Sequence, residues 1–538
     1  GHVVEVDFEP GYANWRSTTH TPRSLIDAGM VKKPTEKKIV NLIQKLAKKA
    51  DLVTIATDYD TEGELIGKEA YELVRAVNPD VRINRARFSA ITPAEIRAAF
   101  ENPVELDFNL AAAGEARQTV DLMWGAALTR FLSLAARRGG RDILSVGRVQ
   151  SPTLAMIVDR EREIENFVPQ TYWVLSLTTE KDGTAFEARH TTGRFTEREA
   201  AFTAKERTKE PLVVTDVEEG QKVDRAPTPF DTTTFIVAAA RLGFSAANAK
   251  RIAEDLYMNG YISYPRTDNT VYPGSLNLNG ILEALKGGVF DKDVAWVQQN
   301  RRPTPTRGKK ESTDHPPIHP TAAASREALG EERWKVYELV VRRFLATLSP
   351  DAKWATTRYT FDASGETYRA TGGRLIDEGW RRVYPYSEAK ETILPEVKPG
   401  ERLPIIDVKL EEKETQPPAR YSQSRLIQVM EELGLGTKST RHEVIGKLIS
   451  RRYVEGNPLR PTLVGRAVID ALDNHAATIT EPEMTRTLEE HMQLIKQNRR
   501  SRDNVITESR QMLHQVFDNL EAHESEIGNE IMEQTAEE

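Results

Sequence analysis

The sequence predicts a multidomain protein of the α+β class, and three observations support this prediction. The chain has 538 residues, which is too long for one compact domain and suggests three to five. Residues 1–104 alternate β-branched apolar runs with helical periodicity, which is typical of an α/β domain. Further along, strand-like runs lie on both sides of a helical block, which indicates a β-rich domain interrupted by an insertion.

The composition excludes several classes of protein. The hydrophobic fraction is 39% and no uninterrupted apolar run of about 18 residues occurs, so a soluble protein is predicted. The absence of cysteine excludes disulfides and thiolate metal sites, and it permits a reducing compartment.

Charge is segregated along the chain. There are 74 basic and 81 acidic residues, and a nucleic-acid-binding protein of such balance must gather its positive charge on one surface. Residues 518–538 contain acids but no Lys or Arg, which predicts a solvated acidic tail. Two stretches are crowded with basic residues: Arg130, Arg137, Arg138, Arg141 and Arg148 in one, and Arg301, Arg302, Arg307, Lys309 and Lys310 in the other.

Three carboxylates, Asp58, Asp60 and Glu62, follow a predicted strand at 52–57 and lead into a predicted helix. If the strand continues through them, their spacing places them on one face. The carboxyl end of a parallel strand is where open α/β sheets bind ligands, and hard oxygens suit Mg²⁺. Together with Gly63 and Glu69 these residues also nearly match a calcium-binding EF-hand loop. That alternative is disfavoured because such a loop is entered from a helix, not from β-branched strand residues.

The predicted helical region 105–168 contains a segment suited to binding phosphate, Ser145-Val146-Gly147-Arg148-Val149-Gln150-Ser151. Gly147 lets backbone approach a phosphate, Ser145 and Ser151 can donate hydrogen bonds to it, and Arg148 can bind the backbone or stack on a base. Ser151 followed by Pro152 also predicts a helix start. The two interpretations are compatible, because a helix N-terminus offers amide donors to an anion.

The inserted block, 236–347, carries a tyrosine and an arginine two residues apart, Tyr264 and Arg266, just after a predicted helix at 246–258. A Tyr hydroxyl, with a pKa of about 10, is a poor nucleophile unless its proton is removed. An adjacent guanidinium favours the phenolate and offers bidentate hydrogen bonds to phosphate. Taken alone, the pair is far more typical of a buried tyrosine beside a surface arginine.

The segment Gly260-Tyr-Ile-Ser-Tyr-Pro-Arg-Thr-Asp268 resembles the active-site segment of type IA DNA topoisomerases, in which the second Tyr forms a 5′-phosphotyrosyl link to DNA. The resemblance implies that Tyr264 is the nucleophile and that Arg266 stabilises transition-state charge. Asp314-His-Pro-Pro-Ile-His-Pro-Thr321 resembles the family's active-site histidine loop, which implies that His315, and not His319, contacts the scissile-region phosphate.

The acidic segment resembles the triad of the Toprim domain, which this family shares with primases. It implies Asp58 and Asp60 as metal ligands, with Glu62 nearby and Mg²⁺ as the cofactor. Family Toprim domains begin with a strand that carries a Glu and a Lys, whereas Gly1-His2-Val3 resembles the segment after that strand. We therefore expect this chain to cleave or religate DNA poorly.

Further segments resemble the family's single-strand groove. A predicted helix at 110–124 resembles a groove helix, and the turn at 434–441, followed by a helix, forms a phosphate cradle. Other branches carry Arg-Pro at Thr437-Lys438, and Lys lacks the bidentate contact of Arg. The implied DNA-binding residues are His2, Arg117, Gln118, Asp121, Ser145, Val146, Gly147, Arg148, Val149, Gln150, Ser151, Lys438, Ser439 and Thr440.

The resemblance implies a toroid in which a β arch carries the tyrosine domain away from the Toprim side. The predicted parts are 1–104 Toprim domain, 105–168 groove domain, 169–235 β arch, 236–347 inserted tyrosine domain, 348–412 β arch, 413–517 groove domain and 518–538 acidic tail.

The implied function is ATP-independent relaxation of negatively supercoiled DNA, and no GxxxxGK[ST] phosphate-binding loop is present. The implied partner is a single-stranded segment of that DNA, bound by a monomer in the cytoplasm with the chromosome and without a membrane. The histidine loop most resembles the archaeal topoisomerase I branch. The alternatives are a decatenating topoisomerase III subtype, the strand-passing half of a reverse gyrase, and a single-strand DNA-binding protein without chemistry.

Overall fold

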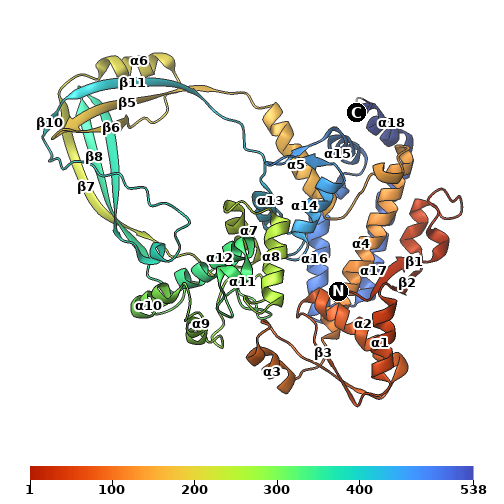
Figure 1. Ribbon diagram of the computed structural model, residues 1–538. Coiled ribbons are helices and arrows are strands. Elements are labelled where there is room, and N and C mark those ends of the chain that lie inside the picture. The colour runs from red at the N-terminus through yellow and green to blue at the C-terminus, as the bar shows by residue number, and fades with distance from the viewer. Residues whose placement is uncertain (537–538) are drawn as a thin grey trace.

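The computed structural model describes residues 1–536, and its helices and strands surround an open centre (Figure 1). A β arch forms one side of this ring, a tall helical body forms the other, and a smaller set of helices lies between the foot of the arch and the N-terminal region. The multidomain α+β prediction is confirmed. No helix within the described range combines the length and apolar character needed to cross a membrane.

The N-terminal region contains two small sheets. Strands β1 (Val4–Phe8) and β2 (Met30–Pro34) pair antiparallel, and β3 (Leu52–Ile55) and β4 (Arg82–Arg85) pair parallel. Because parallel strands need a crossover, the chain between the latter two forms a helix, α2. The helices here are α1 (Lys37–Ala47), α2 (Thr61–Val77) and α3 (Pro93–Glu101).

The loop after β3 is held by a buried ion pair. Arg85 and Glu64 are both fully buried, with their nitrogen and oxygen atoms 2.7 Å apart. The Arg85 guanidinium also donates to the carbonyl oxygens of Thr57 and Asp58, at 2.7 and 2.9 Å. A planar five-donor group therefore fixes the backbone that carries the acidic residues.

The prediction that Asp58, Asp60 and Glu62 share one face of a strand is wrong. The strand ends at Ile55, and Asp60 is the N-cap of α2, where its carboxylate accepts a 2.6 Å hydrogen bond from the Gly63 amide. The first amides of a helix lack intrahelical partners, and an Asp side chain satisfies one of them here.

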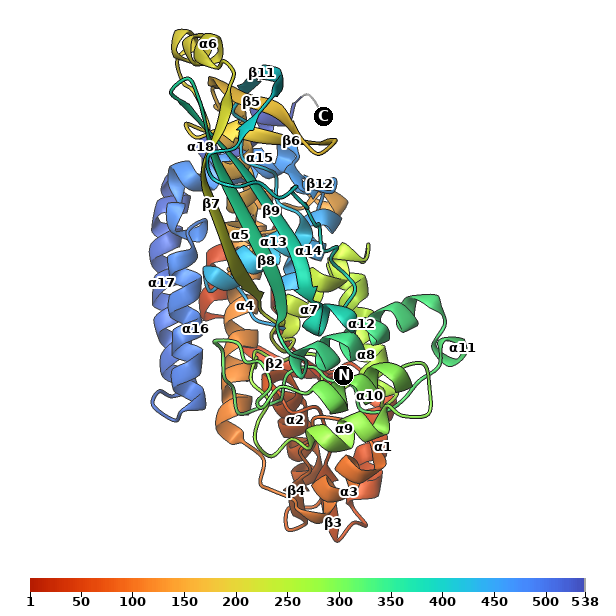
Figure 2. The same ribbon diagram turned by 90° about the vertical axis from the view of Figure 1, so that its left-hand side faces the viewer.

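The helical body joins two distant parts of the chain. Its axis is α4, at the centre of which Trp124 is fully buried and donates to Ser509 at 2.8 Å. Figure 2 shows α16 and α17 running alongside it. The helices of the body are α4 (Phe108–Ala135), α5 (Gln150–Glu165), α13 (Gln423–Glu432), α14 (Arg441–Ser450), α15 (Leu463–His475), α16 (Pro482–Lys496), α17 (Arg502–Ala522) and α18 (Glu524–Gln534), with a short hairpin of β12 (Val454–Glu455) and β13 (Arg460–Pro461).

The arch is a seven-stranded antiparallel sheet in the order β10-β7-β8-β9-β6-β5-β11. Its strands β7 and β8, which flank the inserted block, pair from Leu212–Ala363 to Asp224–Ala352. The insertion therefore leaves and re-enters the sheet at one place. The elements are β5 (Thr171–Lys181), β6 (Thr184–His190), α6 (Arg198–Arg207), β7 (Leu212–Asp224), β8 (Ala352–Ala363), β9 (Glu366–Asp377), β10 (Arg402–Leu403) and β11 (Ile405–Glu414).

The inserted block is helical and lies beside the N-terminal region (Figure 1). The N-terminus of its first helix, α7, has a capping box, in which the side chains of Asp231 and Thr234 each accept a hydrogen bond from the other's backbone amide. The helices are α7 (Thr232–Arg241), α8 (Ala246–Met258), α9 (Leu278–Ala284), α10 (Asp291–Asn300), α11 (Arg326–Leu329) and α12 (Glu331–Thr347).

The prediction of a solvated acidic tail at 518–538 is wrong for the residues that the structure describes, 518–536. The chain continues α17 to Ala522 and then forms α18, whose Ile527 and Ile531 are buried. Gly528 packs so closely on α4 that a Cβ there would lie 2.1 Å from the carbonyl oxygen of Ala135. The apolar residues recur at helical spacing, and their burial outweighs the acidic composition.

Candidate active site

The tyrosine segment lies against the N-terminal region. The Tyr264 amide donates to the Ser89 carbonyl at 2.8 Å. Gly260 begins the segment with φ +79°, and a Cβ at this position would lie 2.6 Å from the Ile91 carbonyl oxygen. Glycine therefore meets two requirements here, a left-handed backbone and close approach to a second chain segment.

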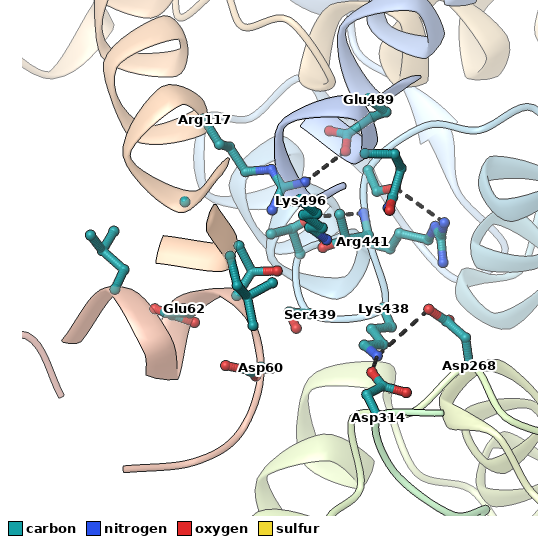
Figure 3. Close-up of a pocket in the computed structure, with 18 of the residues that line it drawn as sticks. Asp60, Glu62, Arg117, Asp268, Asp314, Lys438, Ser439, Arg441, Glu489 and Lys496 are labelled. Carbon is teal, nitrogen blue, oxygen red and sulfur yellow. Dashed lines mark hydrogen bonds and ion pairs between the residues drawn. The ribbon is translucent and has the colours of Figure 1, made fainter. Parts of the chain in front are cut away.

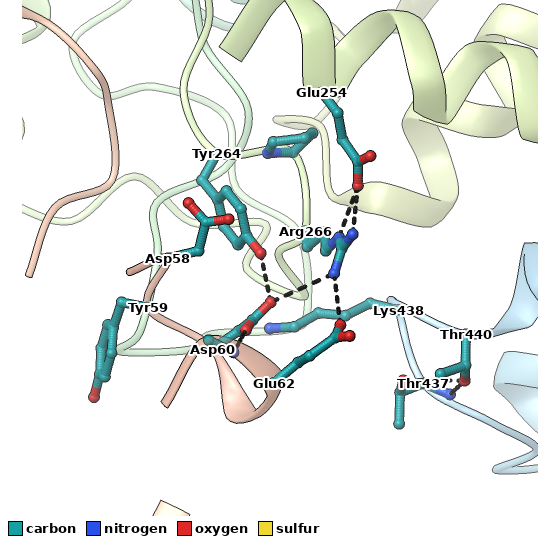
Figure 4. A network of polar contacts seen from close by, with 12 residues as sticks. Asp58, Tyr59, Asp60, Glu62, Glu254, Tyr264, Arg266, Thr437, Lys438 and Thr440 are labelled. Atoms are coloured by element: carbon teal, nitrogen blue, oxygen red, sulfur yellow. Dashed lines mark hydrogen bonds and ion pairs between the residues drawn. The ribbon is translucent and has the colours of Figure 1, made fainter. Parts of the chain in front are cut away.

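The Tyr264 hydroxyl donates to the Asp60 carboxylate (Figure 4). Only 3% of the residue is exposed, and its ring lies 4.6 Å from that of His315 and 5.0 Å from that of Tyr257. The Tyr257 hydroxyl donates to Asp58 at 2.8 Å. Two tyrosines from the insertion thus bind two aspartates from the loop after β3.

Arg266 is surrounded by carboxylates. Its guanidinium donates twice to Glu254, at 2.9 and 2.6 Å, and once to Glu62, at 3.1 Å. It also lies 3.8 Å from Asp60, the acceptor of the tyrosine proton. The arginine is therefore at the predicted place, but its charge is already neutralised by protein groups.

The electrostatics keep Tyr264 protonated in this arrangement. Burial, followed by the charge of Asp60, raises the pKa of Tyr264 far above 10, and the opposing effect of Arg266 is smaller. Burial also raises the pKa of Asp58. Arg266 does favour the phenolate, as expected from the sequence, but burial and the charge of Asp60 outweigh it.

His315 and His319 differ in their surroundings. His315 Nδ1 lies 2.8 Å from the Ser89 hydroxyl, and its Nε2 contacts the Tyr59 carbonyl. Burial lowers the pKa of His315. His319 is held by the Pro320 carbonyl at 2.8 Å, and burial lowers its pKa to about 4. Of the two, His315 has its ring against that of Tyr264.

The three acidic residues have separate partners. Asp58 and Asp60 accept from the tyrosines, while Glu62 lies 3.4 Å from His2 and 3.1 Å from Arg266. Hydrogen bonds that His2 donates to the carboxylates of Glu62 and Glu69 raise the pKa of His2 to about 9. The carboxylate oxygens of Asp58, Asp60 and Glu62 suit Mg²⁺ chemically. Within residues 1–536, however, three metal-ligating atoms lie within 4.8 Å of one another only at the end of α15.

A groove runs from the acidic residues into the helical body. One cavity of about 1080 Å³ is lined by Asp60, Glu62 and most predicted DNA-binding residues of 110–124 and 434–441 (Figure 3). A second, of about 810 Å³, is lined by Ser145–Gln150 and shares Arg117, Asp121 and Thr440 with the first. Ser151 is instead buried and bonds the Gly147 amide at 3.3 Å.

Acidic side chains of the protein form ion pairs with the basic groups of this groove. Glu489 accepts from Arg117 at 2.6 Å and lies 3.3 Å from Arg148. Although burial acts in the other direction, these arginines lower the pKa of Glu489 to about 2. Lys438 likewise binds Asp314 at 2.8 Å.

The sequence analysis did not find four residues of the site: Glu254, Ser89, Glu489 and Lys496. Each acts through a contact across the folded chain, and no local motif marks it. Lys496 lines the first cavity, where burial, with Arg117 nearby, lowers its pKa to about 8.

Comparison with known proteins identifies the family of this chain. The profile of the DNA topoisomerase family matches residues 105–507, and that of the Toprim domain matches residues 1–91. The chain belongs to the type IA DNA topoisomerase family. It is therefore a DNA topoisomerase by family, an isomerase that acts on DNA, and it carries a Toprim domain, which is a metal-binding domain.

The topoisomerase relatives cover nearly the whole chain. DNA topoisomerase 1 of Archaeoglobus fulgidus is 50% identical over 96% of this chain and 77% of its own length. DNA topoisomerase 1 of Thermoplasma acidophilum is 44% identical over 96% of this chain and 66% of its own length. The structure of full-length topoisomerase I from Thermotoga maritima superposes with a TM-score of 0.78 at 29% identity, over 96% of this chain and 86% of that one.

Proposed function

We propose that this type IA topoisomerase relaxes negatively supercoiled DNA, without ATP, by cutting and rejoining one strand through Tyr264. The observation that supports this most directly is the contact of the Tyr264 hydroxyl with Asp60, beside Arg266, at the end of a groove lined by both basic and acidic residues. The proposal keeps the division of residues 1–517 given above, and it adds α17 and α18 to the helical body in place of the acidic tail.

The chemistry follows from these groups. The Tyr264 oxygen attacks a backbone phosphorus, the bond from phosphorus to the 3′-oxygen breaks, and a 5′-phosphotyrosine and a free 3′-hydroxyl result. Asp60 is the carboxylate placed to receive the tyrosine proton, and it returns that proton to the leaving 3′-oxygen, so the step balances. Arg266, once released from Glu254 and Glu62, stabilises the charge on the phosphate. The ester is rejoined by the reverse step, so no ATP is needed.

Magnesium belongs to this proposal as the ion that Asp58 and Asp60 hold, with Glu62 nearby. When bound, it supplies positive charge that orients the DNA backbone. His315 is proposed to donate to the phosphate through Nε2, which would exchange the Tyr59 carbonyl for it, while Ser89 keeps the ring oriented through Nδ1.

The DNA is proposed to enter as a single strand, bound by one copy of the chain, in the cytoplasm with the chromosome. Tyr264 does not line the groove, because Asp60 and its neighbours lie between them. The tyrosine domain must therefore move from residues 89–91 just far enough for a phosphate to enter beside both Tyr264 and Asp60. A larger movement in the same direction then opens the ring for strand passage.

A covalent-trapping experiment tests the proposal. A single-stranded oligonucleotide labelled at its 3′ end is incubated with the chain and Mg²⁺, denatured, and separated on a denaturing gel. We expect labelled protein, in low yield, from the wild type and from Tyr257→Phe, and none from Tyr264→Phe. Binding of the oligonucleotide without any covalent product would instead support the single-strand DNA-binding alternative.

A further inference from the structure

Two histidines and two glutamates meet where α15, α17 and α18 join. His475 is the last residue of α15, and His523 is the single residue between α17 and α18. Glu526 and Glu530 lie on α18, one turn apart. Two separate parts of the chain, His475 and the stretch 523–530, therefore place metal-ligating side chains near one another.

The geometry of this cluster is close to that of a metal site. One ligand atom from each of His475, His523 and Glu526 lies within 4.8 Å of the other two. His523 Nδ1 is 3.2 Å from Glu526, and His475 Nε2 is 3.4 Å from Glu530. Ligands at about 2.1 Å from a tetrahedral ion lie about 3.4 Å apart, so a small inward movement of His523 and Glu526 suits the group of three. Glu530 lies outside that group but beside His475, and the same movement brings the ion within its reach as the fourth ligand.

The surroundings leave room for that movement. The side chains of His523 and Glu526 are 45% and 66% exposed, whereas His475 and Glu530 are more enclosed, at 13% and 24%. The other carboxylate oxygen of Glu530 accepts from the Asn474 amide at 2.7 Å. One half of the cluster is thus held in place and the other half is free to close on an ion.

We propose that His475, His523, Glu526 and Glu530 bind a divalent transition metal, with Zn²⁺ as the best match. Imidazole and carboxylate together suit Zn²⁺, whereas Mg²⁺ and Ca²⁺ prefer oxygen ligands alone. The site is separate from the proposed magnesium site. It lies near Ala135 of α4, about 30 Å along that helix from Gly114, which packs on α2.

The metal would fasten the C-terminal helix. In both overall views α18 lies at the far end of the helical body from α2 and β3 (Figures 1 and 2). It is anchored there by Ile527, Gly528 and Ile531 on its inner face. An ion shared between α15 and α18 adds a cross-link on the outer face, and it stabilises the folded state because the unfolded chain lacks the assembled site.

Metal titration of the full chain tests this inference. The chain is stripped with a chelator and titrated with Zn²⁺ against a chromophoric competitor, with excess Mg²⁺ present to occupy oxygen-only sites. We expect one equivalent of Zn²⁺ to bind and the unfolding temperature to rise. Co²⁺ in place of Zn²⁺ should give the visible absorption bands of a tetrahedral ion with nitrogen ligands.

Variants identify the ligands. His475→Gln and His523→Gln should each weaken Zn²⁺ binding by more than about 100-fold, and Asn474→Ala, which only orients Glu530, by about 10-fold. Glu524→Gln on the same helix and His514→Gln on α17 are matched controls and should bind as the wild type does. Absence of saturable Zn²⁺ binding, or equal binding by both ligand variants and the wild type, would overturn the proposal. Circular dichroism verifies that each variant is folded.

Discussion

At the scale of single residues, Glu489 occupies the position between Arg117 and Arg148 where a DNA phosphate is proposed to bind. Glu489 and Arg117 are 372 positions apart in the sequence. Arg148, the other partner of Glu489, is only 3% exposed. A DNA strand must exchange its phosphate for this carboxylate, and the exchange reduces the net affinity.

We expect Glu489→Gln to bind single-stranded DNA about 10-fold more tightly, since it removes the competing charge but keeps the side chain's shape. Fluorescence anisotropy with a labelled oligonucleotide measures the change. Glu490→Gln is the matched control, because that exposed neighbour lines the same cavity. Equal affinities for the two variants would show that Glu489 does not compete with DNA.

A second prediction concerns Lys496, whose pKa is lowered to about 8. Its charged form is disfavoured in the fold, so stability should rise as pH increases from about 8 toward the ordinary lysine pKa of about 10.4. The affinity for DNA should fall as the pH rises through about 8, because the groove then loses the positive charge of Lys496. Affinity measured from about pH 7 to about pH 9 should show this decline in the wild type and not in Lys496→Arg, which stays charged.

At the scale of elements, local signals predicted some features and missed others for physical reasons. The cluster after Leu52–Ile55 was found because a strand followed by acids is a local pattern. Its geometry was not found, because Asp60 serves as a helix cap and Asp58 is bound by Tyr257, from a helix about 200 residues later. Helix α18 was missed because acidic composition was given more weight than the spacing of Ile527 and Ile531.

The exit of α8 gives a test of how the tyrosine segment is held. Gly260→Ala introduces both left-handed strain, about 1–2 kcal/mol, and a clash with the Ile91 carbonyl. Gly287→Ala introduces the strain alone, since φ is +91° but nothing lies within 4 Å. We therefore expect the first variant to lose more stability in denaturant unfolding and to become sensitive to proteolysis near Tyr264. Equal losses would show that the close approach at Ile91 contributes nothing.

At the scale of the whole molecule, the ring brings together residues that the sequence separates widely. Strands β7 and β8 pair across the insertion, and the two halves of the helical body pack on α4. The ring itself was predicted from the sequence, because the motifs resemble those of the family and occur in the same order. The side-chain pairs that close it, such as Tyr264 with Asp60, depend on how two domains meet, which periodicity and spacing do not determine.

The last prediction concerns the contact between the tyrosine domain and the N-terminal region. A chain in which this contact is locked should bind DNA but not cut it. Thr92 and Asn259 flank the contact between Ile91 and Gly260, and with consecutive Cα atoms about 3.8 Å apart they lie within reach of a short bismaleimide. The chain contains no cysteine, so Thr92→Cys with Asn259→Cys directs the reagent to this pair alone.

The cross-linked chain should keep most of its affinity for a single-stranded oligonucleotide, because most of the groove's lining belongs to the helical body, and it should lose the covalent product at Tyr264. The same double variant without reagent is the control for the substitutions. A linker with an internal disulfide should restore the product after reduction, because only the tether changes in that step. If the locked chain cuts DNA as the unlocked chain does, Tyr264 reaches the phosphate without separation of the two domains, and the movement belongs to strand passage alone.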